Sequence, residues 1–137
     1  MKALNILILV FVVLSVGCKT QKIAPMPEPI NSATTAKTPV SSKEETVSAA
    51  KGEASDFGSK RFYVILGSFS IYDNAVKFKK QLMSQDFTPG ILVNENGLYR
   101  VSVNSYDDEN QARARISDIR KNYPEQYSDV WLLIKKQ

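Results

Sequence analysis

Few side chains in this sequence of 137 residues could perform acid or base chemistry. The chain contains no histidine, which removes the commonest general base and the commonest transition-metal ligand. Glu95 falls in an expected turn, and the run Asp107-Asp108-Glu109 falls at an expected helix start, where acidic side chains stabilise the backbone. No convergent acid–base pair can be recognised. The sequence therefore predicts a protein that is not an enzyme and that uses no metal and no cofactor.

Cys18 is the one cysteine, so it cannot form a disulfide within the chain. Lys2 precedes an apolar run that ends at Val16, which has the length of a secretory signal core and is shorter than the roughly 20 residues that span a membrane. The segment Leu14-Ser15-Val16-Gly17-Cys18 resembles the lipobox of bacterial lipoprotein signal peptides, with Ser15 where leucine is usual. The resemblance implies that residues 1–17 are a cleaved signal peptide and that Cys18 is acylated.

The expected location follows from the same resemblance. Acyl chains on Cys18 would anchor the chain to a membrane and leave it facing the periplasm. Residue 19 is Lys and not the Asp that often marks inner-membrane retention, so the outer membrane is the expected address. The alternative is an uncleaved membrane anchor with an incidental cysteine.

The rest of the chain divides by composition. Residues 18–59 are rich in Ser, Thr, Ala, Lys and Glu, are interrupted by four prolines, and are predicted to be a disordered tether. Residues 60–137 contain most of the aromatic residues and are predicted to be one small domain. This domain has 12 Lys and Arg against 9 Asp and Glu, a net +3, which is low for a protein that binds phosphate backbones.

The predicted domain contains two copies of one unit, offset by 37 residues. Residues 62–82 align with residues 99–119, and in each copy a strand is followed by a short turn and a helix. Strands are expected at residues 61–66, 90–93, 98–103 and 130–134, and Asn96-Gly97 is a strong hairpin turn. The helices are expected to begin at Ser70 and Asp107 as N-caps and to bury Ala75, Phe78, Leu82, Ala112, Ile116 and Ile119. The fold class is therefore α+β, βαββαβ and ferredoxin-like, with a four-stranded antiparallel sheet and both helices on one face.

The other face of such a sheet has no cover, so its residues are candidates for binding. Strand alternation places Val64, Tyr99 and Val101 in the core and turns the intervening residues to the open face. The open face then carries Tyr63, Ile65, Leu98, Arg100, Ser102 and Trp131.

Such a surface of aromatic and aliphatic side chains can bind sugars. The sugar ring stacks on the aromatic side chains, and a guanidinium donates hydrogen bonds to the sugar oxygens. Because the guanidinium would be mostly solvated, loss of Arg100 is expected to change stability by no more than about 0.5 kcal/mol. The alternatives are core packing for Tyr63 and Trp131, and a surface ion pair for Arg100.

Several motifs of the predicted domain resemble the SPOR (sporulation-related repeat) family. They are Tyr63-Val64-Ile65-Leu66-Gly67-Ser68-Phe69-Ser70, then Asn74-Ala75, then Gly97-Leu98-Tyr99-Arg100-Val101-Ser102-Val103, then Ala112. The resemblance implies a βαββαβ domain that binds peptidoglycan glycan strands denuded of stem peptides, often at division sites. By motif position, Ser68 and Arg100 correspond to family binding residues. Leu98 stands where some members have tryptophan, and Ile65 stands where many have glutamine.

Two other classes of function compete with glycan binding. RNA recognition motifs share this topology and stack bases on the open sheet. The expected secretion signal argues against nucleic-acid binding, and so does the lack of a Lys/Arg-Gly-Phe pattern in the third strand. An envelope scaffold that binds division or other envelope proteins through the same sheet remains the second alternative.

Overall fold

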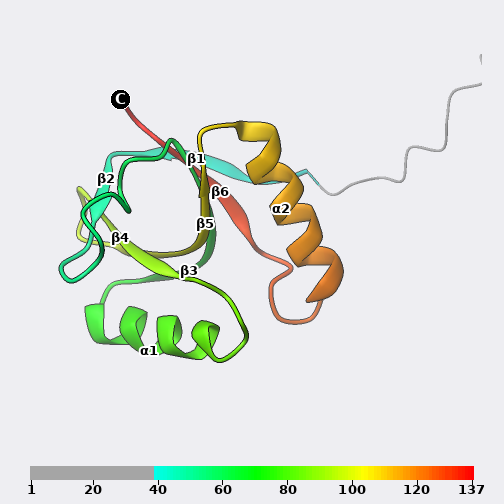
Figure 1. Cartoon of the computed structure of the whole chain (residues 1–137), viewed down its shortest axis with the longest axis horizontal. Helices are drawn as coiled ribbons and strands as arrows, with labels where there is room; N and C mark the ends of the chain where they lie inside the picture. Colours follow the sequence, from blue (N-terminus) through cyan, green and yellow to red (C-terminus); the bar gives the residue numbers. More distant parts are fainter. Residues whose placement is uncertain (1–38) are drawn as a thin grey trace, which may run out of the picture. The chain divides into compact units, whose positions relative to one another are not determined.

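A computed structural model describes residues 39–137, shown in Figure 1. The predicted signal peptide and Cys18 lie outside these residues. The elements are β1 (Ser42–Glu45), β2 (Val47–Ala49), β3 (Phe62–Phe69), α1 (Tyr72–Met83), β4 (Gly90–Asn94), β5 (Tyr99–Tyr106), α2 (Glu109–Asn122) and β6 (Trp131–Lys135). No helix in this described part is long and apolar enough to cross a membrane.

The central part of the fold confirms the βαββαβ prediction. Strands β6, β3, β5 and β4 lie side by side in that order, and each neighbouring pair is antiparallel. Both helices pack on the sheet and share one hydrophobic core with it. Most of the predicted core residues are buried, namely Val64, Val101, Ala75, Leu82, Ala112, Ile116 and Ile119, while Phe78 and Tyr99 are partly buried against the same core. The helices therefore cover one face of the four strands, as expected.

The two copies of the sequence repeat form matching elements. Strand β3 runs from residue 62 to 69 and β5 from 99 to 106, so their bounds differ by the same 37 residues at both ends. These two strands are the central pair of the sheet. Helices α1 and α2 begin at residues 72 and 109, again 37 apart. The repeat thus places two strand–helix units side by side around the middle of the sheet.

The sheet has six strands and is mixed, so the prediction of four antiparallel strands was incomplete. Strand β1 pairs in parallel with β6, and β2 pairs antiparallel with β4. Only Thr46 separates β1 from β2, so residues 42–49 form one nearly continuous strand, here called the closing segment. Because β6 and β4 are opposite edges of the four-stranded sheet, the sheet must curl until the closing segment reaches both (Figure 1).

The closing segment also corrects the boundary of the predicted tether. Residues 42–49 were expected to be disordered, because their composition is polar. In the structure Glu45 and Val47 are buried and Ala49 is half-buried, whereas Glu44, Thr46 and Ser48 are exposed. This alternation is that of a half-buried strand, and backbone pairing with two edges offsets the scarcity of apolar side chains. In the part of the chain that the structure describes, the fold therefore includes residues 42–49, which lie before the predicted boundary at residue 60.

Both predicted helix caps are displaced by one residue. The N-cap of α1 is Ile71 and not Ser70, and no side chain caps it. The N-cap of α2 is Asp108, whose carboxylate accepts a hydrogen bond from the backbone N–H of Gln111. Asp107 instead forms an ion pair with Lys60.

Candidate functional site

Strand alternation correctly predicted that one side of the sheet, away from the helices, carries Tyr63, Ile65, Arg100, Ser102 and Trp131. Tyr63 and Ile65 belong to a second hydrophobic cluster with Leu92 and Leu133, separate from the core under the helices, and Trp131 packs against it. Arg100 lies opposite Leu92 in the β4–β5 ladder, and Ser102 lies opposite Ile65 in the β3–β5 ladder. Residues that face each other across a ladder project to the same side.

The prediction that this face is uncovered was wrong. Tyr63, Ile65 and Ser102 are fully buried, and only 7% of Arg100 is exposed. Val47 of the closing segment belongs to the same cluster as Tyr63 and Ile65. The sheet curls toward the side away from the helices, and the closing segment lies over its inner face. The alternative of core packing holds for Tyr63 in this conformation.

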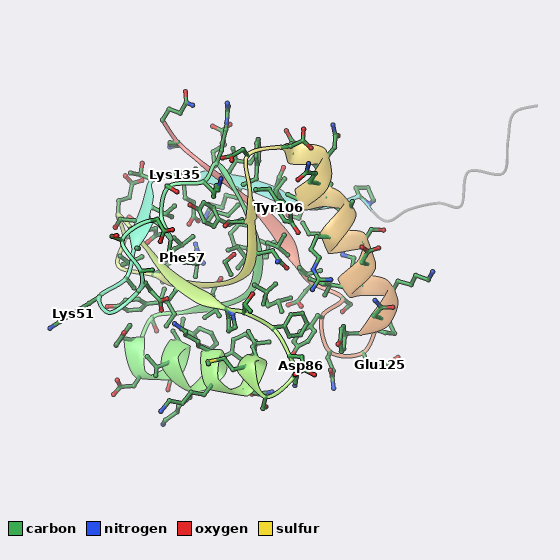
Figure 2. The ribbon with its side chains drawn as sticks, viewed as in Figure 1. Lys51, Phe57, Asp86, Tyr106, Glu125 and Lys135 are labelled. Atoms are coloured by element: carbon green, nitrogen blue, oxygen red, sulfur yellow. The ribbon has the colours of Figure 1, made fainter. Side chains whose placement is uncertain are left out.

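The loop between the closing segment and β3 covers one end of this face. Phe57, labelled in Figure 2, contacts the Tyr63 ring edge-on with the ring centroids 6.1 Å apart, and its carbonyl accepts a hydrogen bond from the Tyr63 hydroxyl. Burial raises the pKa of Tyr63 to about 12. Phe57 also lies over Gly90, where a Cβ atom would come within 2.3 Å of the ring. Glycine is therefore required at this position for the ring to pack as it does.

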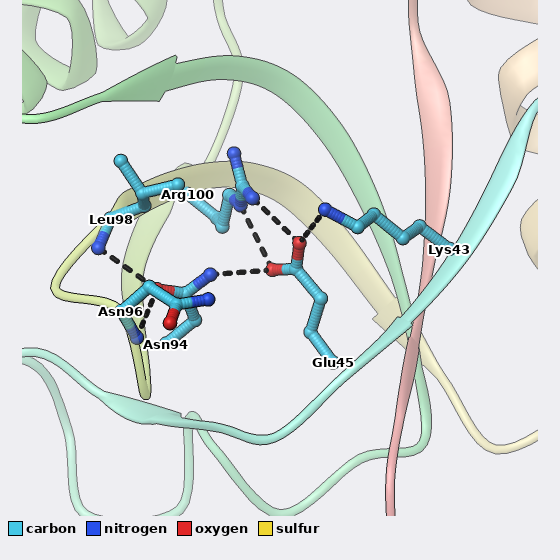
Figure 3. Close-up of polar contacts among 6 residues, drawn as sticks. All are labelled: Lys43, Glu45, Asn94, Asn96, Leu98 and Arg100. Atoms are coloured by element: carbon cyan, nitrogen blue, oxygen red, sulfur yellow. Dashed lines mark hydrogen bonds and ion pairs between the residues drawn. The ribbon is translucent and has the colours of Figure 1, made fainter.

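Arg100 forms a buried ion pair with Glu45 of the closing segment (Figure 3). Its Nε donates to Glu45 Oε2 at 3.0 Å, and its Nη2 donates to Glu45 Oε1 at 2.6 Å. Asn94 Nδ2 donates to the same carboxylate at 3.2 Å, and the ammonium of Lys43 lies 3.0 Å from it. Four donor atoms from three residues thus surround one carboxylate. The alternative of an ion pair for Arg100 is the one found, although the pair is buried and not on the surface.

The charge of Glu45 is strongly favoured in this setting. Burial alone would raise the pKa of Glu45, but hydrogen bonds from Arg100, Lys43 and Asn94 outweigh burial and lower the pKa to about 2. A carboxylate at this position is therefore ionised at neutral pH, and it compensates the charge of the guanidinium that the sheet would otherwise bury alone.

Ser68, Leu98 and Trp131 remain accessible in part. Ser68 is exposed, and the other two are half-buried. Ser68 is the register partner of Arg100. The guanidinium carbon of Arg100 lies 5.5 Å from the centroid of the Trp131 ring, within reach of a cation–π contact. The second hydrophobic cluster is thus bordered by an accessible serine, Ser68, and by the contact between Arg100 and Trp131.

A β-bulge brings Ser68 to this face. Strict alternation from Ile65 would point Gly67 to the open side and Ser68 toward the helices. The β3–β5 register shifts between Ile65 and Gly67. A Cβ atom on Gly67 would come within 2.7 Å of the Phe78 ring on α1, so Gly67 faces the helix. The extra residue of the bulge returns Ser68 to the side of Arg100.

Ser102 has an internal role in this conformation. Its hydroxyl donates to the carbonyl of Asn104 at 2.8 Å, and the residue is fully buried. The hydroxyl therefore hydrogen-bonds to the backbone of its own strand, β5, where the β3–β5 register also shifts between Val64 and Ile65. It is not available to a ligand while the closing segment is in place.

Comparison with known families gives one match. Residues 58–128 match the SPOR domain, which is more than half of the chain. This chain belongs to the SPOR domain family. Comparison with curated proteins and with solved structures gives no match. The SPOR domain is a peptidoglycan-binding, non-catalytic domain.

The SPOR match begins at residue 58, after the closing segment. The matched residues therefore supply β3, β4, β5 and both helices, whereas Glu45 and Val47 come from outside the matched region. In the part of the chain that the structure describes, no three acidic or cysteine side chains are grouped as they would be to hold a metal ion.

Sequence reasoning missed Lys43, Glu45, Val47 and Asn94 as parts of this site. The available signal was weak: Glu45, Val47 and Ala49 alternate with more exposed residues over only a few positions. Nothing in the sequence indicates that Glu45 meets Arg100, which lies 55 residues later. Asn94 directly precedes the hairpin turn, and its side-chain oxygen accepts hydrogen bonds from the backbone N–H groups of Asn96 and Leu98.

Proposed function

We propose that this SPOR protein is a non-catalytic envelope lipoprotein that binds peptidoglycan glycan strands, with a preference for strands denuded of stem peptides. The proposed site is the sheet face away from the helices, with Ser68, Arg100 and Trp131 as the principal contacts. The observation that carries the proposal is the position of the Arg100 guanidinium over the Trp131 ring, with Ser68 beside it, in a domain of the SPOR family.

The chemistry of these groups suits an N-acetylated sugar polymer. The apolar face of a sugar ring stacks on an aromatic side chain such as Trp131. Hydroxyl and acetamide oxygens accept hydrogen bonds from a guanidinium and from a serine hydroxyl. Removal of stem peptides would free space along the sugar chain and allow it to lie close to the sheet. The remaining predicted contacts are Leu98, which is half-buried, and Tyr63, Ile65 and Ser102, which are fully buried in this conformation.

The anchor is a separate part of the proposal. Residues 1–17 would act as a lipoprotein signal peptide, and acylated Cys18 would hold the protein at a membrane, with the outer membrane favoured. Between Cys18 and Ser42 there are 23 residues, which could span at most about 80 Å. Such a spacer would let the domain reach the peptidoglycan layer, in cell division or in envelope maintenance.

Sedimentation with purified sacculi tests the binding function. We expect the protein to pellet with sacculi, and to pellet more completely after amidase treatment has removed stem peptides. Ser68→Ala should weaken binding by about twofold to tenfold, as expected for one neutral hydrogen bond. Met83→Ala is the matched control, because Met83 is exposed on α1. A protein that stays in the supernatant with both kinds of sacculi would contradict glycan binding and favour an envelope scaffold.

Trp131→Leu tests the position of the site. Leucine keeps an apolar side chain against the buried cluster, while the aromatic face for sugar stacking is lost. We expect binding to denuded sacculi to fall by about threefold to tenfold. Unchanged binding in both Trp131→Leu and Ser68→Ala would place the glycan elsewhere on the domain.

A further inference from the structure

We propose that the closing segment, residues 42–49, is a built-in occupant of the glycan site, and that a glycan strand binds when this segment is released. The inference rests on the function proposed above and concerns the regulation of the same site. The segment lies over the residues that the SPOR domain would present to a glycan, and it contributes both a polar and an apolar contact to them.

The contacts of the closing segment resemble those expected of a sugar. The oxygens of Glu45 accept hydrogen bonds from Arg100 and Asn94, the donors that would otherwise take hydroxyl and acetamide oxygens. Val47 packs on the apolar cluster that contains Tyr63, where a sugar ring would stack. Arg100 thus has a partner in either state, which avoids the cost of an unpaired buried charge.

The rest of the domain does not depend on this segment for its main core. The core under the helices is formed almost entirely by residues 62–134, and Ala50 and Val40 are its only members in the described residues before β3. The SPOR match also begins after the segment. Loss of the segment would therefore be a local opening of the edge strands, and not unfolding of the whole domain.

The backbone attachment is short on each side. Four residues pair with β6 and three pair with β4, and the side chain of Lys43 is 64% exposed. Short edge pairings open more readily than the central strands of a sheet. If only a fraction of molecules is open, the apparent affinity for glycan falls in proportion to that fraction. The closing segment would then set the affinity of the site.

A disulfide that locks the segment provides the test. Ser48 and Val93 face each other in the antiparallel β2–β4 ladder, and Cα atoms across such a pair lie about 4.5–5.5 Å apart, within the range of a disulfide. Ser48 is exposed and Val93 is half-buried, and neither belongs to the buried cluster on the proposed glycan face. The variant is Ser48→Cys with Val93→Cys in the full chain in detergent, with Cys18→Ser so that only the new thiols react.

We expect the oxidised variant to bind denuded sacculi at least tenfold more weakly than the same protein after reduction. Val47→Ser, which removes an apolar contact of the segment, should strengthen binding by several fold, while Ser48→Ala should leave it unchanged as the matched control. Melting temperatures of all variants establish that the domain stays folded.

The outcomes separate this inference from the proposed function. Equal binding by the oxidised and reduced forms would overturn the inference, because the segment would then stay in place while glycan binds. If the oxidised form, the reduced form, Val47→Ser and the parent all fail to bind denuded sacculi, the proposed function is wrong. The inference would then be wrong as well.

Discussion

Glu45 and Arg100 form an ion pair across 55 residues of sequence, with hydrogen bonds of 3.0 and 2.6 Å between them. Side chains of both residues are less than 10% exposed. The pair joins the closing segment to the central strand β5. The energetic role of Arg100 therefore differs from that of a solvated cation on an open sheet, and the first two predictions follow from this difference.

Arg100→Ala should destabilise the domain by about 3 kcal/mol, because it leaves the Glu45 carboxylate without its main partner. The value is at the lower end of the range for a broken buried pair, since release of the closing segment would return Glu45 to water. Urea unfolding at pH 7 measures the change. Lys77→Ala, at an exposed site on α1, is the control and should stay within about 0.5 kcal/mol. An equally small effect of Arg100→Ala would mean that the pair does not persist in solution.

The stability contributed by Glu45 should depend on pH. Its pKa is about 2 in the folded protein against an ordinary value of 4.5. A lowered pKa means that the ionised carboxylate stabilises the fold above about pH 4.5, and that this contribution, on the order of 3 kcal/mol, is lost as the pH falls toward 2. The difference in unfolding free energy between the parent and Glu45→Gln should therefore narrow between pH 7 and about pH 2.5. A constant difference across this range would contradict the assignment.

Gly90→Ala should destabilise the domain by about 1–3 kcal/mol, because the new methyl group would displace the Phe57 ring. The cost should fall below about 0.5 kcal/mol when Phe57 has already been changed to alanine. A double-mutant cycle on urea unfolding measures this coupling. Additive effects would indicate that the ring does not lie over Gly90.

Limited proteolysis should leave a resistant fragment that begins near Val40, because residues 42–49 pair with both β6 and β4. Mass spectrometry of the fragment identifies its first residue. A fragment that begins near Ser59 would instead support the boundary predicted from composition, and would indicate that the closing segment is mostly released.

Cys18 is expected to be acylated and to be the first residue of the mature chain. Mass spectrometry of the mature protein would then show the mass of residues 18–137 with attached lipid. Cys18→Ala should lose both the lipid and the cleavage, and should partition differently into detergent. A variant that remains membrane-bound and is processed like the parent would refute the lipobox assignment.

The sequence was sufficient to predict the four central strands, both helices and the side of the sheet on which most of the candidate residues lie. These features depend on local periodicity, which Tyr63, Arg100 and Trp131 follow. Their exposure could not be predicted, because it depends on a polar segment that becomes ordered only through backbone pairing with two distant edges. The position of Ser68 was inferred from a family motif, whereas its physical cause is a β-bulge that periodicity does not reveal.

The closing segment has a further consequence for the surface of the protein. A four-stranded sheet would leave the backbone N–H and C=O groups of β4 and β6 free at its two edges, and such edges are templates for pairing with other chains. Residues 42–49 occupy both edges at once. Molecules crowded together would then resist strand-to-strand aggregation for as long as this segment stays paired.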